Sequence, residues 1–415
     1  MYNDRRVTVR ELILLGSLYV TQYLGFSFFI EALVAIMRKN GASLQSISVI
    51  YLLGFFWMLK FLWAPLIDRY SPVKRWKYKG WLLIFQFCLA VSLLVTSGLS
   101  VGEDLKTLML IGVFIGFFSS TQDVVVDALA YGLLGEQDRG IGNAVKIAGG
   151  MLGYMIGGGA GLMLYAWLGW EKCLWVLASL TAVSFVQLIF FKEPVFKPYI
   201  RGNTGYVSYF FRFWLNGRLR WLFLLFFYPI GICIAYTLIS PILVDSGWRL
   251  DVIGLVVNVI GSAVGAVSAF FAGVMIKKIG RGKMLMSLSL AQGATILLLL
   301  LPIGGYSGTA IVLISVSMIL IVYSPSATLL STIMMDQVSG EKPATDFAMQ
   351  HSLYLMVGFF SGFAGTAMAG IFGYTVMISA ASLMAFLAAA VSSVLYRRSS
   401  GGDIRIPELS TVTEQ

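Results

Sequence analysis

Ala64-Pro65-Leu66-Ile67-Asp68-Arg69 ends one long apolar run of the chain, and Gly273-Val274-Met275-Ile276-Lys277-Lys278-Ile279-Gly280-Arg281 ends another. Each stretch passes from apolar side chains to charged ones within a few positions, as a membrane helix does where it leaves the bilayer on the cytoplasmic side. The two stretches lie half a chain apart. This spacing predicts that the chain consists of two related halves.

A second match supports this duplication at nearly the same spacing. Gly135-Glu136 in the first half corresponds to Gly340-Glu341 in the second. The same alignment pairs Lys146 with His351, Gly153 with Gly358, and Gly157 with Gly362. Because the two matches have nearly the same spacing along the chain, they predict one duplicated unit with a small difference in loop length.

The composition is that of a membrane protein. Of the 415 residues, 58% are hydrophobic and 12% are charged, whereas a soluble domain is about 45–50% apolar and about 25% charged. This balance excludes a soluble globular enzyme and a disordered chain. The apolar runs are long and continuous, which indicates helices. Twelve spans are predicted at 10–37, 44–66, 80–99, 105–133, 140–168, 170–191, 220–244, 252–276, 284–301, 309–335, 346–372 and 374–396.

The charged residues of the loops predict the orientation. The net charge is +10, and a surplus of Lys and Arg in cytoplasmic loops explains it better than a nucleic-acid partner does. With both termini in the cytoplasm, the opposite side carries only Arg38, Lys39, Lys106, Lys172 and Arg249. We therefore expect a multi-pass membrane protein with both ends in the cytoplasm.

The spans divide the chain into four parts. We expect a six-helix bundle over 1–195, a cytoplasmic linker over 196–219, a second six-helix bundle over 220–398 and a disordered tail over 399–415. The linker is rich in aromatic residues from Tyr206 to Trp214, a pattern typical of an interfacial amphipathic helix. A plain linker is the alternative.

The loop that follows the second span carries the first functional signature. Ala64-x-x-x-Asp68-Arg69 resembles the Gly-x-x-x-Asp-Arg-x-Gly-Arg motif of the major facilitator superfamily, although it lacks both glycines. The copy at 273–281 keeps both glycines and Arg281. The resemblance implies an all-α fold of two six-helix halves, a substrate site between them, and a gating role for Asp68, Arg69 and Arg281. Solvated loop charges are the alternative.

Two carboxylates lie within the fourth span. Asp123 and Asp127 are four residues apart and therefore share a helix face. A carboxylate inside the membrane is expensive, and it faces the interior of a bundle, a partner or water. Such a group can take up and release a proton, which suits coupling to a proton gradient. The alternatives are structural pairing with Lys146 or Lys60, or solvation of Asp127.

Two further residues are candidates for proton coupling. Glu31 lies toward the outer end of the first span, either as a proton entry point or as a solvated surface residue. His351 is the only histidine, and its ordinary pKa suits coupling or gating. A histidine that only packs between helices is equally consistent.

A third set of polar residues is assigned to the substrate. Gln22, Tyr23, Gln122 and Lys146 are the candidates, because they lie within predicted spans. Gln22 is also suited to an interhelical hydrogen bond. Lys146 is also placed to hold a carboxylate or to extend toward the cytoplasm. Lys60 is expected to extend its ammonium group toward the cytoplasm.

The motif of the fourth span narrows the resemblance. Gln-Asp-x-x-x-Asp-Ala, followed by Glu136-x-x-Arg139-Gly140 and a glycine-rich helix, resembles the AmpG-type muropeptide permeases. The stretches 61–70 and 80–83 resemble the same branch. The length of the chain and Tyr19-Val20-Thr21-Gln22-Tyr23-Leu24-Gly25-Phe26 are similar to the RhtX/FptX-type siderophore permeases, which lack additional C-terminal helices.

These observations and the resemblance predict a secondary transporter of the bacterial inner membrane that works by alternating access. We expect proton-coupled import of a ferric siderophore; the alternatives are a muropeptide or anhydro-sugar permease, or efflux of a small molecule. The expected partners are that small molecule, protons and the lipid bilayer, with no nucleic acid, and the expected unit is a monomer. No enzyme activity, cofactor or metal site is expected, because the chain shows no nucleophile–base pair, nucleotide-binding loop or metal-binding cluster.

Overall fold

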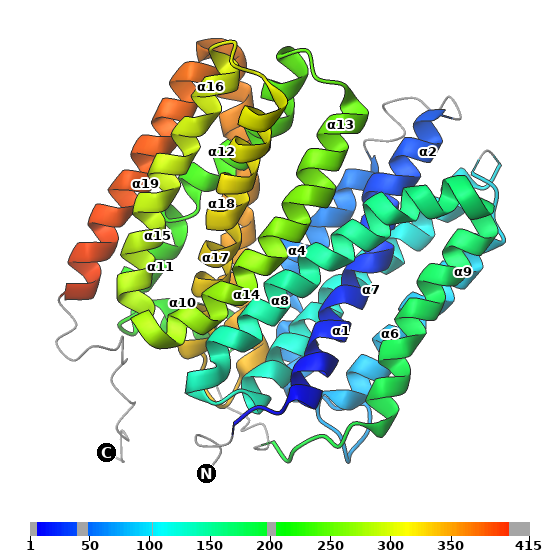
Figure 1. Ribbon diagram of the computed structural model, residues 1–415. Coiled ribbons are helices and arrows are strands. Elements are labelled where there is room, and N and C mark those ends of the chain that lie inside the picture. Colours follow the sequence, from blue (N-terminus) through cyan, green and yellow to red (C-terminus); the bar gives the residue numbers. More distant parts are fainter. Residues whose placement is uncertain (1–5, 40–48, 102, 197–204, 398–415) are drawn as a thin grey trace.

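The structure, a computed structural model, describes residues 6–39, 49–101, 103–196 and 205–397, and these are mostly helical (Figure 1). Elements marked η are 3-10 or π-helical turns. The first half contains α1 (Val9–Ser27), η1 (Phe28–Leu33), α2 (Val34–Lys39), η2 (Val49–Gly54), α4 (Phe55–Leu59), η3 (Lys60–Leu62), α5 (Ala64–Arg69), α6 (Lys79–Ser97), α7 (Leu105–Leu133), η4 (Glu136–Asp138), α8 (Arg139–Tyr154), η5 (Met155–Ala160) and α9 (Gly161–Phe190).

The second half repeats this helical plan after a short linker helix. It contains α10 (Tyr206–Leu215), α11 (Leu219–Phe227), α12 (Ile230–Asp245), α13 (Leu250–Gly254), η6 (Leu255–Ile260), α14 (Gly261–Ile279), α15 (Arg281–Ile296), η7 (Leu297–Leu299), α16 (Leu300–Ile303), α17 (Thr309–Asp336), α18 (Pro343–Phe372) and α19 (Tyr374–Arg397).

Ten helices in the described part of the chain are long and apolar enough to cross a membrane. One of them, Glu136–Phe190, has 55 residues, and Gly169 interrupts it with a positive φ of 80°. Since only glycine adopts this conformation without strain, Gly169 turns the chain between the two crossings predicted there. The second predicted crossing contains the shorter apolar helix Leu52–Leu62, and part of it lies outside the described residues. The all-helical membrane fold is confirmed, and the count of twelve stays a prediction.

The two halves lie side by side, and α1 begins at the same end of the bundle at which α19 ends (Figure 1). We call this end the terminal end. An even number of membrane crossings places the first and the last helix end on the same side in this way. That the terminal end faces the cytoplasm stays a prediction from the loop charges.

The apolar core is shared at the terminal end and divided at the other. One buried cluster combines residues of both halves, including Leu14 and Leu330. Two further clusters lie each within one half, around Leu33 in the first and Leu238 in the second. Since buried apolar contacts hold packed elements together, the halves share a core at the terminal end, whereas toward the opposite end each half has a core of its own.

Glycines permit the closest helix contacts. A Cβ atom on Gly153 would lie 2.5 Å from the carbonyl oxygen of Val20, so α8 meets α1 backbone to backbone. A Cβ atom on Gly140 would lie 2.9 Å from the carbonyl oxygen of Gly273, which brings α8 against α14 of the other half. No larger residue fits at either position without a shift of a helix.

The linker contains a helix, α10, and buries Phe213 and Trp214. The aromatic stretch of the linker is thus helical. That this helix lies at a membrane interface stays a prediction. The predicted disordered tail, 399–415, lies outside the described residues.

Candidate functional site

A cavity of about 510 Å³ lies between the two halves. In the first half its walls come from η1, α4, α8 and the end of α1; in the second half they come from α12, η6, α17 and α18. The lining residues on α8 run from Lys146 to Tyr154, away from the terminal end. The cavity therefore begins near the middle of the bundle, above the core that joins the halves.

Aromatic rings form a platform on each side of this cavity. In the first half the rings of Tyr23 and Trp57 are stacked, with centroids 4.6 Å apart and an interplanar angle of 16°. In the second half Tyr236 and Tyr323 are stacked at 5.1 Å and 14°. Flat aromatic faces of this kind offer apolar contact surface to a ring-shaped ligand.

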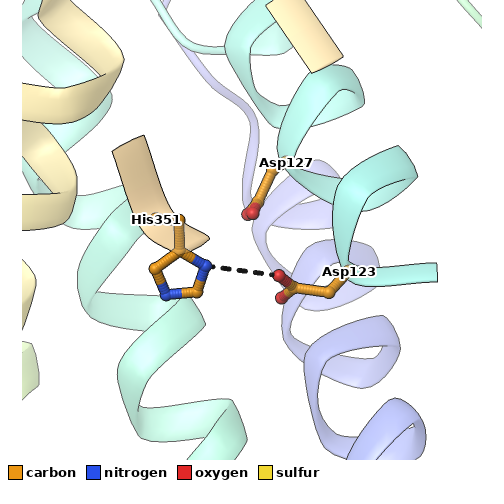
Figure 2. A group of neighbouring side chains, drawn as sticks. All are labelled: Asp123, Asp127 and His351. Atoms are coloured by element: carbon orange, nitrogen blue, oxygen red, sulfur yellow. Dashed lines mark ion pairs between the residues drawn. The ribbon is translucent and has the colours of Figure 1, made fainter. Parts of the chain in front are cut away.

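Five polar side chains form a cluster at the end of the cavity nearest the terminal end. Lys60 donates to Asp123 in a short contact and lies 2.7 Å from Nδ1 of His351. Lys146 donates to Oδ2 of Asp127 at 2.5 Å and lies 3.6 Å from Oδ1 of Asp123. Nδ1 of His351 is 3.6 Å from Oδ2 of Asp123 (Figure 2). The five side chains are at most 7% exposed. We call this set the charge cluster.

Helix α1 fixes the two carboxylates. The hydroxyl group of Tyr19 donates to Oδ1 of Asp127 at 2.9 Å, and Nε2 of Gln22 donates to Oδ1 of Asp123 at 2.9 Å. Each carboxylate is thus held by α1 as well as by a lysine. Four elements of the first half, α1, η3, α7 and α8, meet α18 of the second half through these bonds.

The expected position of Lys60 is wrong. Its side chain is 0% exposed and points to Asp123 and His351 instead of extending to the cytoplasm. The contact with Asp123 is instead the structural pairing that was the alternative for the two carboxylates, whereas a lysine near a span end usually extends to water. The partner lies on another helix, and only the packing of α4 and η3 against α7 and α18 makes it available.

The charge cluster includes a geometry that a metal ion could use. One ligand atom each of Asp123, Asp127 and His351 lies within 4.8 Å of the others. Both carboxylates, however, already accept from lysine ammonium groups. A divalent cation would have to displace Lys60 and Lys146 in a buried space, so the donor set does not fit a metal ion well.

The predicted substrate residues divide into two pairs. Tyr23 and Lys146 line the cavity. Gln22 and Gln122 are fully buried outside its lining, and Nε2 of Gln122 donates to the carbonyl oxygen of Leu18 at 3.1 Å. Gln22 makes the interhelical bond that was its alternative assignment. Glu31 lines the cavity far from the charge cluster.

Asp68 connects the two halves at the terminal end. Its carboxylate accepts from the backbone N–H groups of Ala344 at 3.1 Å and Thr345 at 2.8 Å, and from the Thr345 hydroxyl at 2.6 Å. These groups form the first turn of α18, which attracts a negative charge. Burial raises the pKa of Asp68 to about 6, and the hydrogen bonds from Thr345 oppose that rise. Arg69 is exposed and stacks on Tyr70 instead.

A second contact between the halves centres on Asp336, which the sequence did not single out. Arg281 donates to its carboxylate through Nε and, at 3.1 Å, through Nη2. Arg139 of the other half donates to the same carboxylate at 2.9 Å. Asp336 directly follows the predicted span 309–335, on the side of the membrane that is rich in Lys and Arg. Its position could have indicated a partner among these cations. The predicted gating residue Arg281 thus lies at a contact between halves.

Comparison with known proteins agrees with this architecture. A family model described as Major Facilitator Superfamily matches residues 15–366. The anhydromuropeptide permease of Escherichia coli K12 is 30% identical over 268 residues, which are 63% of this chain and 55% of that permease. An uncharacterized protein of Haemophilus influenzae is 31% identical over 246 residues, 57% of this chain and 58% of that protein. The chain spans somewhat more than half the length of these relatives.

Two solved structures show the same arrangement of helices. The human organic anion transporter MFSD10 (TETRAN) has a TM-score of 0.75 at 15% identity, covering 92% of this chain and 99% of that one. The fucose:proton symporter FucP of E. coli has a TM-score of 0.69 at 12% identity, covering 95% and 99%. At such identities the likeness shows the fold alone.

Proposed function

The chain belongs to the Major Facilitator Superfamily, and from that premise we propose that it is a secondary transporter that imports an anhydromuropeptide-type substrate together with a proton. We further propose that it works as a monomer in the bacterial inner membrane, with both ends in the cytoplasm. The charge cluster at the end of the cavity is the observation that carries the coupling. Four of its residues come from the first half and His351 comes from the second, so the cluster lies where the two halves meet.

The substrate proposal rests on the relatives and on the cavity. The matching E. coli protein is named as an anhydromuropeptide permease. The stacked pairs Tyr23–Trp57 and Tyr236–Tyr323 give each half an aromatic face, and such faces suit the apolar sides of sugar rings. The siderophore import expected from chain length gains no support from these relatives, so muropeptide import replaces it.

The coupling follows from the balance of charge. Lys60 and Lys146 carry two positive charges, Asp123 and Asp127 carry two negative ones, and a neutral His351 leaves the sum at zero. A proton added alone makes the buried cluster positive, and an anionic substrate group added alone makes it negative. Either state is costly away from water. The sum returns to zero when both are bound, so proton and anion favour each other's entry.

Asp127 is the proposed proton acceptor. It shares Lys146 with the cavity, because Lys146 both donates to Asp127 and lines the cavity wall. Protonation of Asp127 weakens that ion pair and frees the ammonium group for a substrate carboxylate. Asp123 stays ionised between Lys60 and Gln22. Occupation of both sites then allows the halves to rock, which breaks the contacts of Asp68 and Asp336.

Uptake measurements test the proposal directly. A radiolabelled anhydromuropeptide would be supplied to cells that lack their own permease, with and without a protonophore. We expect accumulation that depends on this chain and falls when the protonophore is added. Accumulation of a ferric siderophore instead, or release of muropeptide from preloaded cells without uptake, would contradict the proposed substrate or direction.

Variants separate coupling from substrate binding. Asp127→Asn is expected to abolish uphill accumulation while the variant still exchanges labelled for unlabelled substrate across the membrane, since exchange needs no net proton movement. Glu103→Gln is the matched control, because Glu103 is exposed near the start of the same helix. Full accumulation by Asp127→Asn would refute the proposed proton site.

A further inference from the structure

Glu31 places a carboxyl group in the cavity wall that nothing in the proposed cycle uses. Among the described residues that line the cavity, it is the only one with a carboxyl group. No hydrogen bond or ion pair reaches that carboxyl group from the described part of the chain. Lys146, the one lysine in the lining, is already paired with Asp127. Among the described residues, the carboxyl group of Glu31 in the cavity wall therefore has no cationic partner.

The position of Glu31 is fixed by its neighbour on the fifth predicted span. A Cβ atom on Gly158 would lie 2.0 Å from Oε2 of Glu31, so the carboxyl group rests directly on η5. Lys146 lies on the same continuous helix, formed by α8 and η5. At a rise of about 1.5 Å per residue, Gly158 lies about 18 Å along this helix from Lys146.

Three π-helical turns meet around this carboxyl group. Glu31 belongs to η1, Gly158 belongs to η5, and η5 in turn contacts η6, where Val259 would lie 3.5 Å from a Cβ atom on Gly159. Asn258 of η6 lines the cavity beside them. Since π-helical turns are rare and frequent at functional sites, three of them at one place point to a binding function here.

Aromatic rings complete the surroundings. Tyr154 and Tyr236, one from each half, line the same cavity as Glu31. A carboxylate near aromatic faces is the arrangement that binds an organic cation, because the carboxylate supplies the charge and the rings attract the cation through their π faces.

We propose that Glu31 binds a primary ammonium group of the substrate at the outer part of the cavity. This inference rests on the proposed function and deepens it. The substrate is then amphoteric and elongated, with an anionic group at Lys146 and an ammonium group at Glu31, two residues that line the same cavity. Glu31 selects among anhydromuropeptides by their peptide amine, and it is separate from the proton site at Asp127.

The test pairs a change in the protein with a change in the ligand. Uptake kinetics would be measured for an anhydromuropeptide with a free amine on its peptide and for the same molecule with that amine acetylated. Glu31→Gln is expected to raise KM for the free amine by about 10- to 100-fold, which is the range for a hydrogen bond to a charged group. The same variant should leave KM for the acetylated ligand unchanged.

Two variants serve as controls. Glu31→Asp keeps the charge and should retain most of the preference for the free amine. Glu171→Gln removes an exposed carboxylate on α9 that is not part of the cavity lining, and it should behave as the unmodified protein. Equal loss of kcat for both ligands in Glu31→Gln would overturn the proposal, because it would assign Glu31 to proton transfer.

A second measurement needs no uptake at all. The thermal unfolding of the purified protein would be followed with 4-phenylbutylamine and with its N-acetyl derivative. The amine alone should raise Tm, and Glu31→Gln should abolish that rise. Equal responses to the two probes, or an unchanged rise in the variant, would overturn the ammonium site. Failure of the unmodified protein to take up either muropeptide would refute the proposed function separately.

Discussion

The hydroxyl group of Tyr206 donates a hydrogen bond to the carbonyl oxygen of Phe61, 2.7 Å away. In a continuous α-helix this carbonyl would accept from the residue four positions later, which is Pro65, and proline has no N–H group. Linker helix α10 supplies the missing donor. Three residues later Tyr209 donates to Oδ1 of Asp346 on α18 at 2.6 Å. The linker helix is thereby bonded to both halves.

Tyr206→Phe is expected to lower the stability of this closed arrangement. The variant leaves the Phe61 carbonyl without a donor, at a cost of about 1–3 kcal/mol. Thermal unfolding of the purified protein should show a lower Tm, whereas Tyr306→Phe, which changes an exposed tyrosine at the opposite end, should not. An unchanged Tm for Tyr206→Phe would mean that water satisfies the carbonyl equally well.

Asp68 makes the contact at the terminal end sensitive to pH. Burial raises its pKa to about 6 in the closed state, and exposure to water on opening returns the pKa toward about 4. The closed state therefore holds the proton more tightly, so acidification from pH 7 to 4 favours closure and a rise through pH 6 favours opening. The difference of about two pKa units corresponds to at most about 3 kcal/mol.

Spin-label distances measure this equilibrium. Labels at the exposed positions Arg75 and Lys283, one in each half, should show a larger population of long distances at pH 7 than at pH 5. Asp68→Asn should remove most of that difference. A pH response that persists in Asp68→Asn would assign the sensitivity to another group.

Asp336→Asn is expected to favour opening at the terminal end. The variant weakens the bonds to Arg281 and to Arg139 of the other half, whose side chains are 21% and 13% exposed. For partly exposed pairs the expected effect is about 1 kcal/mol, or about a fivefold shift in population. A cysteine at the buried position Ala348 should then react faster with a thiol reagent. Asp138→Asn, a neighbouring change whose carboxylate accepts from Val7 of its own half, should not accelerate the reaction.

Removal of Asp123 alone is expected to destabilise the protein. Asp123→Asn leaves the buried ammonium group of Lys60 without its carboxylate, and breaking such a pair costs about 3–5 kcal/mol. The double variant Asp123→Leu and Lys60→Met leaves Lys146 paired with Asp127, and it should recover most of the lost Tm without recovering uptake. If the single variant were as stable as the double one, the pair would not be structurally important.

The sequence predicted the fold and much of the charge cluster. Asp123 and Asp127 lie on one helix face, which follows from their spacing, and the alignment of Lys146 with His351 placed both residues at related positions of the two halves. The structure brings all four together. The motif at Asp68 likewise indicated the end of a span. The structure shows that Asp68 there binds the N-terminal end of α18.

Asp336 and Tyr206 could not be placed in the same way, and the pairing of Lys60 with a carboxylate was only one of two interpretations of that lysine. Each finds its partner on an element far along the chain, and neither periodicity nor local composition records such a distance. Glu31 was visible as a carboxylate near the end of a span, but not as one that rests on Gly158 inside an aromatic cavity.

By itself the sequence determined the long apolar helices, the duplication and the set of charged residues inside them, because hydrophobic length and helical periodicity are local properties of a chain. Only the tertiary structure decided which charges meet. Lys60 pairs with Asp123 and Lys146 with Asp127 because η3, α7 and α8 of the first half converge where water is excluded. In that surrounding each buried charge must find an opposite one, and packing alone selects the partner.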